Sequence, residues 1–232
     1  MGSLSAIAFA ALQVPGLEGV VPDVPWTQDL INLWRDGGWM MWPIGASALI
    51  GLIVIGWKLF ELSTKSARTR RFLGQIDALI AARKLEEALA LARASNTPAG
   101  RILAAGLERH TEGTDRVMKA IENVGLLEMA QLESGLVWLA TVSNVAPLMG
   151  FLGTVIGMIQ AFQAIEAAGE VEATLVAGGI KVALITTAAG LVIAIPVNIM
   201  HNYFVTRIDR LVLDMEESAQ KMVDTLHARA IA

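Results

Sequence analysis

Three threonines stand in long stretches without an ionisable side chain, and their hydroxyls are the groups in this sequence best suited to handling a cation. Thr154 lies in the charge-free stretch 134–165, and Thr186 and Thr187 lie in the stretch 182–200. A hydroxyl is uncharged, yet it can both donate and accept a hydrogen bond. It can therefore relay a proton or briefly coordinate a cation inside a membrane without the free-energy cost of a buried charge.

A residue count predicts that the polar groups of the two stretches meet in pairs. If both stretches are helices that cross a membrane in opposite directions, Thr154 and Thr187 lie ~16–20 Å from the outer side, near the same level and close to mid-membrane. Asn144 and Asn198 form a second pair nearer the inner side and extend the polar lining. The alternative is structural, because most membrane Ser and Thr side chains bond the carbonyl one turn back or pack between helices.

Small residues recur in the first stretch at a spacing that lets two helices approach closely. Gly150, Gly153 and Gly157 are three and four residues apart and fall on one helix face. Pro147 and Pro196 interrupt the two stretches. Each predicts a kink, because proline lacks the backbone donor and clashes with the preceding turn. Such kinks are either purely structural or lie beside a cavity.

Lys181 is the only charged residue close to this pair of stretches. It lies about two turns from the outer end, so its amine can extend to the membrane surface. The alternative is an ion pair with a partner.

Nothing in the chain predicts an enzyme. It has no cysteine, which excludes thiol catalysis and cysteine-ligated metals, and His110, His201 and His227 lack the spacing of metal ligands or of a catalytic triad. There is no nucleotide-binding loop. We therefore expect no cofactor, no bound metal and no nucleic-acid partner.

The elements that must position these groups are membrane helices. Hydrophobic residues make up 54% of the chain and charged residues 17%, the latter well below the roughly 25% of soluble domains. A bilayer core needs about 20 apolar residues per helix, and three segments qualify. We therefore predict an all-α membrane protein with long helices that extend into a cytoplasmic helical domain. The expected parts are an outer segment 1–36, a first span 37–62, a cytoplasmic domain 63–133, a second span 134–165, an outer loop 166–173, a third span 174–206 and a cytoplasmic helix 207–232.

The distribution of positive charge predicts the orientation. Of the 18 Lys and Arg residues, 11 lie in 63–133 and four follow residue 206, so that side is cytoplasmic by the positive-inside rule. The opposite side carries acidic residues, and its loop 166–173 has no positive charge. Three spans then place the N-terminus outside and the C-terminus inside.

Two features precede the first span. Residues 26–36 predict a short amphipathic helix with Trp26, Leu30, Leu33 and Trp34 on one face, which suits the outer leaflet; an ordinary packing helix is the alternative. Residues 1–14 resemble a short signal-peptide core but lack a preceding Lys or Arg, which leaves cleavage open.

The segment 63–133 is helical by its periodicity. Thr97 and Pro98 predict a helix start, with proline at the first position, and Thr114 is a candidate cap of the next helix. That helix reaches Glu133 without an evident breaker, so we expect it to continue into the second span. The third span likewise continues through 207–232.

Two motifs carry a family resemblance. APLMGFLGTVIGM (146–158) and GGIKVALITTAAGLVIAIP (178–196) resemble the MotA/TolQ/ExbB proton-channel family, and the three-span layout is closest to ExbB and TolQ. The resemblance implies a homopentamer whose second and third spans line a pore. That pore would hold the single helices of an ExbD/TolR-like dimer, which brings the membrane aspartate. Thr154 and Thr187 would be the pore-facing threonines.

The same resemblance implies a place and a task. The protein would lie in the bacterial inner membrane and use an ion gradient to power outer-membrane transport through a TonB-like protein. One departure concerns the ion: ExbB and TolQ usually carry a glutamate where this chain has Val182, and the Thr186–Thr187 pair is similar to sodium-driven flagellar stators. The transported ion is therefore expected to be H⁺, with Na⁺ as the alternative. A TolQ-like role, a sodium-driven stator-type role and a non-conducting membrane scaffold remain alternatives.

Overall fold

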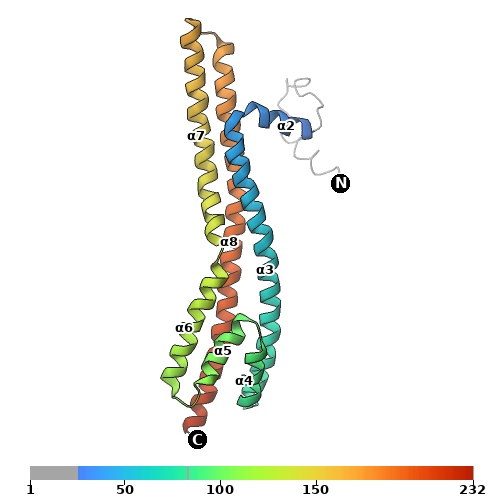
Figure 1. The fold of residues 1–232 in the computed structure, drawn as a ribbon, viewed down its shortest axis with the longest axis vertical. Coiled ribbons are helices and arrows are strands. Elements are labelled where there is room, and N and C mark those ends of the chain that lie inside the picture. The colour runs from blue at the N-terminus through green and yellow to red at the C-terminus, as the bar shows by residue number, and fades with distance from the viewer. Residues whose placement is uncertain (1–25, 83, 232) are drawn as a thin grey trace, which may run out of the picture.

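The chain folds into a few long helices (Figure 1). The computed structural model describes residues 26–82 and 84–231, and it places the side chains of 31–82, 84–174 and 176–226. The elements are α2 (Trp26–Asp36), η1 (Gly38–Met40), α3 (Met41–Ala81), α4 (Leu85–Ala94), α5 (Pro98–Glu108), α6 (Thr114–Glu133), α7 (Leu136–Ala168) and α8 (Ala173–Ile231). The apolar start at residues 1–14 lies outside the described residues.

The expected fold class is confirmed. The described residues contain helices and no strand, and three helices, Gly38–Ala81, Leu136–Ala168 and Val176–Leu226, are long and apolar enough to cross a membrane. As expected, the third continues far beyond its apolar part. α8 has 59 residues, a length of about 90 Å.

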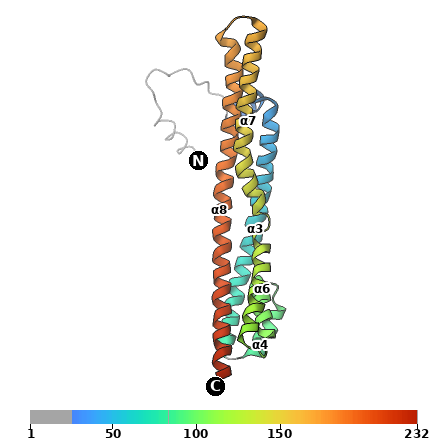
Figure 2. The same ribbon diagram turned by 90° about the vertical axis from the view of Figure 1, so that its left-hand side faces the viewer.

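Two parts share these long helices, and Figures 1 and 2 show them end to end. The hairpin consists of α7 and the first half of α8, joined by the short turn Gly169–Glu172; Gly169 has a φ of 72°, which favours glycine. The turn is shorter than the expected loop 166–173. The bundle consists of α4, α5 and α6 packed against the C-terminal halves of α3 and α8.

The hairpin reaches past the start of α3. Asp36, just before α3, pairs with Lys181, and Gly37 lies beside Ile185 of α8. In the antiparallel pair, this level of α8 faces α7 near Gly153 to Gly157. The remaining turns of the hairpin therefore extend roughly 20 Å beyond α3, as Figure 1 shows.

The bundle has an apolar core, and its helix starts match the sequence with one correction. The core includes Ile76, Leu103, Leu107 and Met222. α5 begins at Pro98 as predicted, and the Thr97 hydroxyl accepts a hydrogen bond from the Gly100 amide at 3.1 Å.

The predicted cap of α6 is wrong by one residue. Gly113 holds the N-cap position with a φ of 100°, and Thr114 is the first helical residue without a side-chain capping bond. Only glycine adopts this backbone conformation readily, so it takes the position that a threonine would occupy elsewhere.

The expected continuity of α6 into α7 is also wrong. α6 ends at Glu133 and α7 begins at Leu136. Ser134 has an extended ψ of 134° and Gly135 a left-handed φ of 87°. An L side chain is strained in this conformation, and a Cβ on Gly135 would lie 3.1 Å from the Trp57 ring. Glycine therefore allows the break, and the tryptophan packs against it.

The helix predicted at 26–36 is confirmed by α2. Trp34 packs edge-on against Trp42 with ring centroids 5.9 Å apart and touches Gly45 of α3, so this side chain has a packing role. Ile31 and Leu33 are exposed, which suits a membrane surface. The side chains of Trp26 and Leu30 lie outside the described part of the chain.

Candidate functional site

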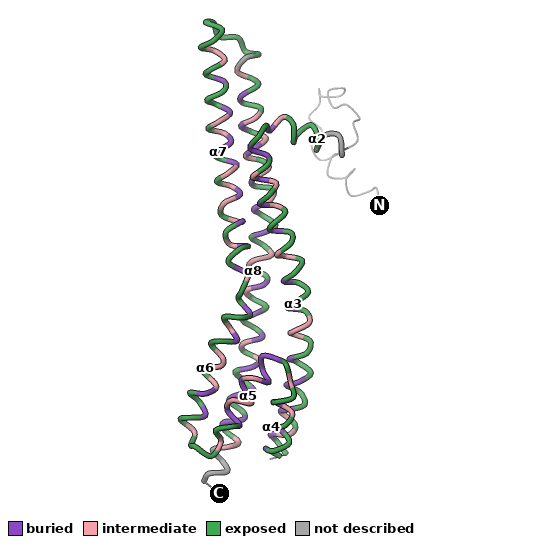
Figure 3. The backbone as a smooth tube through the Cα atoms, viewed as in Figure 1, coloured by how far each residue is buried: buried purple, intermediate pink, exposed green. Residues whose placement is uncertain are grey.

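The seam between α7 and α8 is built from small residues, as the glycine spacing predicts. Buried residues follow the facing sides of the two helices (purple in Figure 3). A Cβ on Gly150 would lie 2.9 Å from the Thr186 carbonyl oxygen, and one on Gly157 would lie 2.6 Å from the Gly179 oxygen. Gly153 faces the Thr186 side chain at similarly close range. The backbones therefore touch, and larger side chains would force them apart.

Both prolines lie inside continuous helices. α7 continues through Pro147 and α8 through Pro196. The kinks stay predictions, as does a cavity beside them.

The threonine hydroxyls all donate to backbone carbonyls. Thr154 donates to Phe151 at 2.6 Å, and Thr186 donates to Val182 and Ala183, each at 3.0 Å. Thr187 donates to Ala183 at 3.1 Å and across the seam to Gly150 at 3.3 Å. Such bonds to nearby carbonyls are those expected if the threonines have only a structural role in helix packing. They use the hydroxyl proton but leave oxygen lone pairs able to accept a proton donor or coordinate a cation.

The three threonines do not share one environment. Thr186 is fully buried in the seam against Gly153. Thr154 and Thr187 are half-buried and flank the buried stripes of their helices. At about 100° per residue, both fall on the side of the hairpin opposite α3, whose Gly51 touches Val142 and Val197. The pathway predicted from Thr154, Thr186 and Thr187 therefore separates into two residues on an open side and one inside the packing.

Relative levels follow from the contacts across the seam. Gly150 lies beside Thr187, and Ala146 beside Gly190, so Thr187 is offset from Thr154 by about one helical turn. Asn144 and Asn198 are offset by a similar amount, and both are exposed. Each predicted pair therefore lies within about one turn in height, and the depth of both pairs in a bilayer stays a prediction.

Lys181 makes an ion pair within the chain. Its Nζ lies 2.5 Å from Oδ2 of Asp36, and the side chains are 58% and 37% exposed. The pair joins α2 to α8 at the level where α3 begins. From the sequence, the Lys181 amine was expected to extend to the membrane surface or to form an ion pair with a partner.

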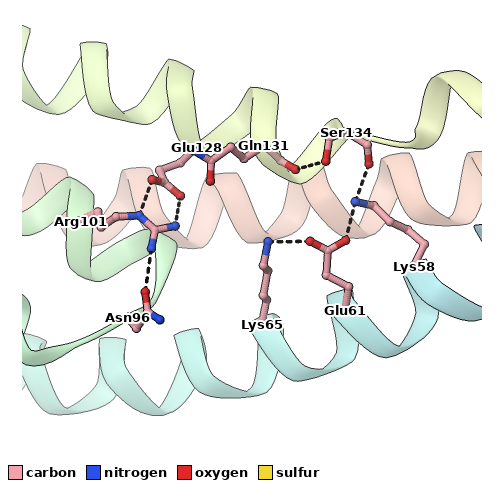
Figure 4. A network of polar contacts seen from close by, with 8 residues as sticks. All are labelled: Lys58, Glu61, Lys65, Asn96, Arg101, Glu128, Gln131 and Ser134. Carbon is pink, nitrogen blue, oxygen red and sulfur yellow. Dashed lines mark hydrogen bonds and ion pairs between the residues drawn. The ribbon is translucent and has the colours of Figure 1, made fainter.

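A charged junction holds the break between α6 and α7, and sequence reasoning missed it (Figure 4). Lys58 is only 1% exposed; its Nζ donates to the Ser134 carbonyl at 2.7 Å and to Glu61 at 2.8 Å. Glu61 also binds Lys65 at 2.7 Å. Because the helix breaks here, the Ser134 carbonyl lacks a hydrogen bond within a helix, and Lys58 supplies the donor.

A second ion pair continues this network into the bundle. Arg101 of α5 binds Glu128 of α6 through two bonds of 2.5 Å, and also reaches Asn96 at 3.2 Å (Figure 4). The bonds from Glu128 raise the pKa of Arg101 above its usual value, although burial lowers it. An arginine guanidinium is charged throughout the physiological range in any case, so the shift leaves its charge there unchanged.

The described residues hold no group of three His, Asp or Glu side chains able to bind a metal. The side of the hairpin that carries Thr154 and Thr187 also presents Ser143 and Asn198 but no carboxylate within the two apolar stretches. Polar, uncharged groups on such a wall can assist a cation. They do not supply a counter-charge of their own.

Comparison with known proteins gives consistent relatives. The sequence profile described as MotA/TolQ/ExbB proton channel family matches residues 94–217. An ExbB homolog of Methanothermobacter thermautotrophicus is 31% identical over 196 residues, 84% of this chain and 69% of the relative. The Tol-Pal system protein TolQ of Haemophilus influenzae is 36% identical over 119 residues, 51% of each chain. The biopolymer transport protein ExbB of Aquifex aeolicus is 35% identical over 114 residues, 49% of this chain and 76% of the relative.

Proposed function

The chain belongs to the MotA/TolQ/ExbB proton channel family, and we propose that it is the ring-forming channel subunit of an ion-driven energy-coupling motor. It is a multi-pass membrane protein with three apolar helices. The observation that carries the proposal is the open side of the hairpin, where Thr154 and Thr187 stand on a wall without carboxylates. Such a wall suits a cation-binding acid supplied by another chain.

The assembly we propose is a homopentamer around two partner helices. The hairpins of five copies would turn their Thr154 and Thr187 sides inward, since α3 covers the opposite side of the hairpin. The pore would hold an ExbD/TolR-like dimer of single-span chains, each with one membrane aspartate. The excess of Lys and Arg in the bundle supports a cytoplasmic bundle, an outer N-terminus and an inner-membrane location.

The proposed mechanism is charge neutralisation followed by rotation. An ionised partner aspartate resists moving along an apolar wall, because an unpaired charge there is costly. A proton that binds to it removes the charge, and the partner helices then turn within the ring. One charge that crosses 100 mV releases about 2.3 kcal/mol. The outer part of the partner would pass this work to a TonB-like protein that opens outer-membrane transporters; no enzymatic step is involved.

Two alternatives have specific support. A TolQ-like role is favoured by the similarity to the TolQ of Haemophilus influenzae. Sodium coupling is favoured by Val182 in place of the usual glutamate and by the adjacent threonines. The burial of Thr186 in the seam weakens the sodium alternative, because it leaves only Thr187 of that pair on the open side. We therefore propose H⁺ as the ion.

Valine substitution tests the proposed site, because valine keeps the shape of threonine and removes the hydroxyl. T154V and T187V should each reduce ion flux in vesicles that contain the chain and its single-span partner, while the native mass of the complex stays the same. T141V is the matched control, since Thr141 is exposed, points away from the seam and bonds only the Val137 carbonyl at 2.8 Å. Flux equal to that of T141V would show that the two hydroxyls have no part in conduction. Absence of ion flux in the assembled, unsubstituted complex would favour the non-conducting scaffold.

The ion is tested separately. Activity is measured with Na⁺ replaced by K⁺ at fixed pH and fixed membrane potential. Unchanged activity is expected for H⁺. A loss of activity that returns with added Na⁺ would establish the sodium alternative.

A further inference from the structure

A groove runs along the bundle between α6 and α8. It has a volume of about 570 Å³ and a mainly apolar lining in which three methionines stand out, Met118, Met129 and Met215. Methionine is flexible and common on surfaces that receive a partner helix. Glu122 and Glu216 also line the groove and are exposed, and neither forms an ion pair within the described part of the chain. The groove therefore combines an apolar lining with two carboxylates that form no ion pair among the described residues.

The opposite edge of the bundle carries a complementary helix face. In the view of Figure 1, α6 and the C-terminal half of α3 lie at opposite edges with α8 between them. Exposed residues recur along α3 at steps of four or three residues, close to the spacing of a coiled-coil contact. This face, the α3 stripe, consists of Ser63, Ala67, Arg71, Gly74, Ala78 and Ala81. Arg71 is its one charge and makes no ion pair with any described residue.

The groove and the α3 stripe lie at the same height. Arg70 Nε is 3.6 Å from Asp214 Oδ2, and Ser218 Oγ is 3.5 Å from Asp77 Oδ2. These contacts set the groove residues of α8, 212–220, level with residues 70–78 of α3. A ring closed by rotation about an axis along the helices joins surfaces of equal height through head-to-tail contacts.

We propose that the groove receives the α3 stripe of the next copy of this chain, with Arg71 between Glu122 and Glu216. The inference rests on the proposed ring and adds the two faces that close it. Charge selects the occupant, since the cation on the stripe meets two carboxylates that form no ion pair among the residues that the structure describes. Small side chains on the stripe let the neighbouring helix sit close to the groove.

Cysteine pairing tests the contact, since the chain has no cysteine of its own. Gly74 is central in the stripe and Gly125 lines the groove; an added Cβ at either meets nothing within 4 Å. A disulfide forms only where Cα atoms come within about 7 Å. Full-length chain carrying G74C and G125C should therefore give a ladder of linked subunits in native membranes under oxidation. G56C with G125C is the control, since Gly56 is equally open but lies several turns away along α3.

Each other result of the pairing experiment has a definite meaning. Dimers from G74C alone or G125C alone would show a two-fold contact and overturn the inference. A G125C link to the single-span partner, in place of a second copy, would also overturn it. An intact oligomer without the ladder of linked subunits would contradict the inference but not the proposed function. A chain that is monomeric in its native membrane would contradict both.

Charge exchange tests the same contact without cysteine. R71E should cause loss of the oligomer in dilute detergent, and the addition of E122R and E216R to the same chain should restore it. R109E is the matched control, because Arg109 is exposed and unpaired among the described residues but lies off both faces. An R71E chain as oligomeric as R109E would contradict the proposed role of Arg71.

Discussion

The seam between α7 and α8 and the junction between α6 and α7 bury polar groups by opposite means. In the seam, hydroxyls such as that of Thr187 donate to carbonyls, and no charged group is buried. In the junction, the charged amine of Lys58 is buried and donates to the Ser134 carbonyl. The helices of the seam are continuous, so their backbone groups have helical partners, apart from the carbonyls one turn before Pro147 and Pro196. The junction has a break, and its carbonyl needs a donor from elsewhere.

This difference teaches how to interpret a buried charge in such a chain. A helix that stays intact can present a charge-free wall, because its backbone polar groups bond one another. In this chain the buried Lys58 serves a backbone break, since it donates to the Ser134 carbonyl. The ion site is expected on the charge-free wall, and the junction is expected to set the angle at which the bundle joins it.

The largest effect should come from a large side chain in the seam. G157L would drive a side chain into the Gly179 oxygen and the Ala183 amide, 2.6 and 2.9 Å from the Cβ position, and backbone atoms cannot move aside as side chains do. We expect loss of the folded hairpin, since overpacking costs about 1–3 kcal/mol or more. Thermal unfolding in detergent measures it. G178L is the control, because Gly178 has open space; equal unfolding midpoints would show that the seam is not close-packed.

Removal of the junction's charge should have the next largest effect. K58M keeps much of the packing but leaves the Ser134 carbonyl and one side of Glu61 without a donor. An unsatisfied buried partner costs about 1–3 kcal/mol. Hydrogen exchange should rise at the α6–α7 break, and the unfolding temperature should fall.

The matched control for the junction is its second lysine. Lys65 binds the same Glu61 but is 33% exposed, so K65M should cost under about 1 kcal/mol. If K58M and K65M were equally stable, the buried lysine would have no special role at the break.

The two adjacent threonines sharpen the comparison within the seam. T187V should reduce ion flux and lower stability by about 1 kcal/mol, because it removes the bond to the Gly150 carbonyl across the seam. T186V should leave flux nearly unchanged, since Thr186 is buried and bonds only its own helix. Flux assays on both variants, with stability measured in parallel, separate the two residues. Equal loss of flux would return Thr186 to the pathway.

The seam could be predicted from sequence and the junction could not. Glycine spacing and the lack of charge are local properties of one stretch, so the close approach of α7 followed from them. The junction joins Lys58 to a carbonyl 76 residues away, which no local pattern reveals. Gly135 was a usable signal for the break, but its apolar surroundings favoured a continuous helix. The separation of Thr186 from Thr187 depends on which face of α8 meets α7, and tertiary packing alone decides that.

The smallest effect on stability is expected for the ion pair of Lys181 and Asp36, which is not buried and bonds no backbone carbonyl among the described residues. Lys181 and Asp36 form a close pair, but both side chains are substantially exposed to solvent. Water and salt screen such a pair, so K181Q or D36N should lower stability by at most about 1 kcal/mol. A double-mutant cycle at low and high salt measures the coupling, which should vanish at high salt. Coupling that persisted there would mean that this pair is shielded like Lys58, and the hairpin would then have a second charged attachment beside α2.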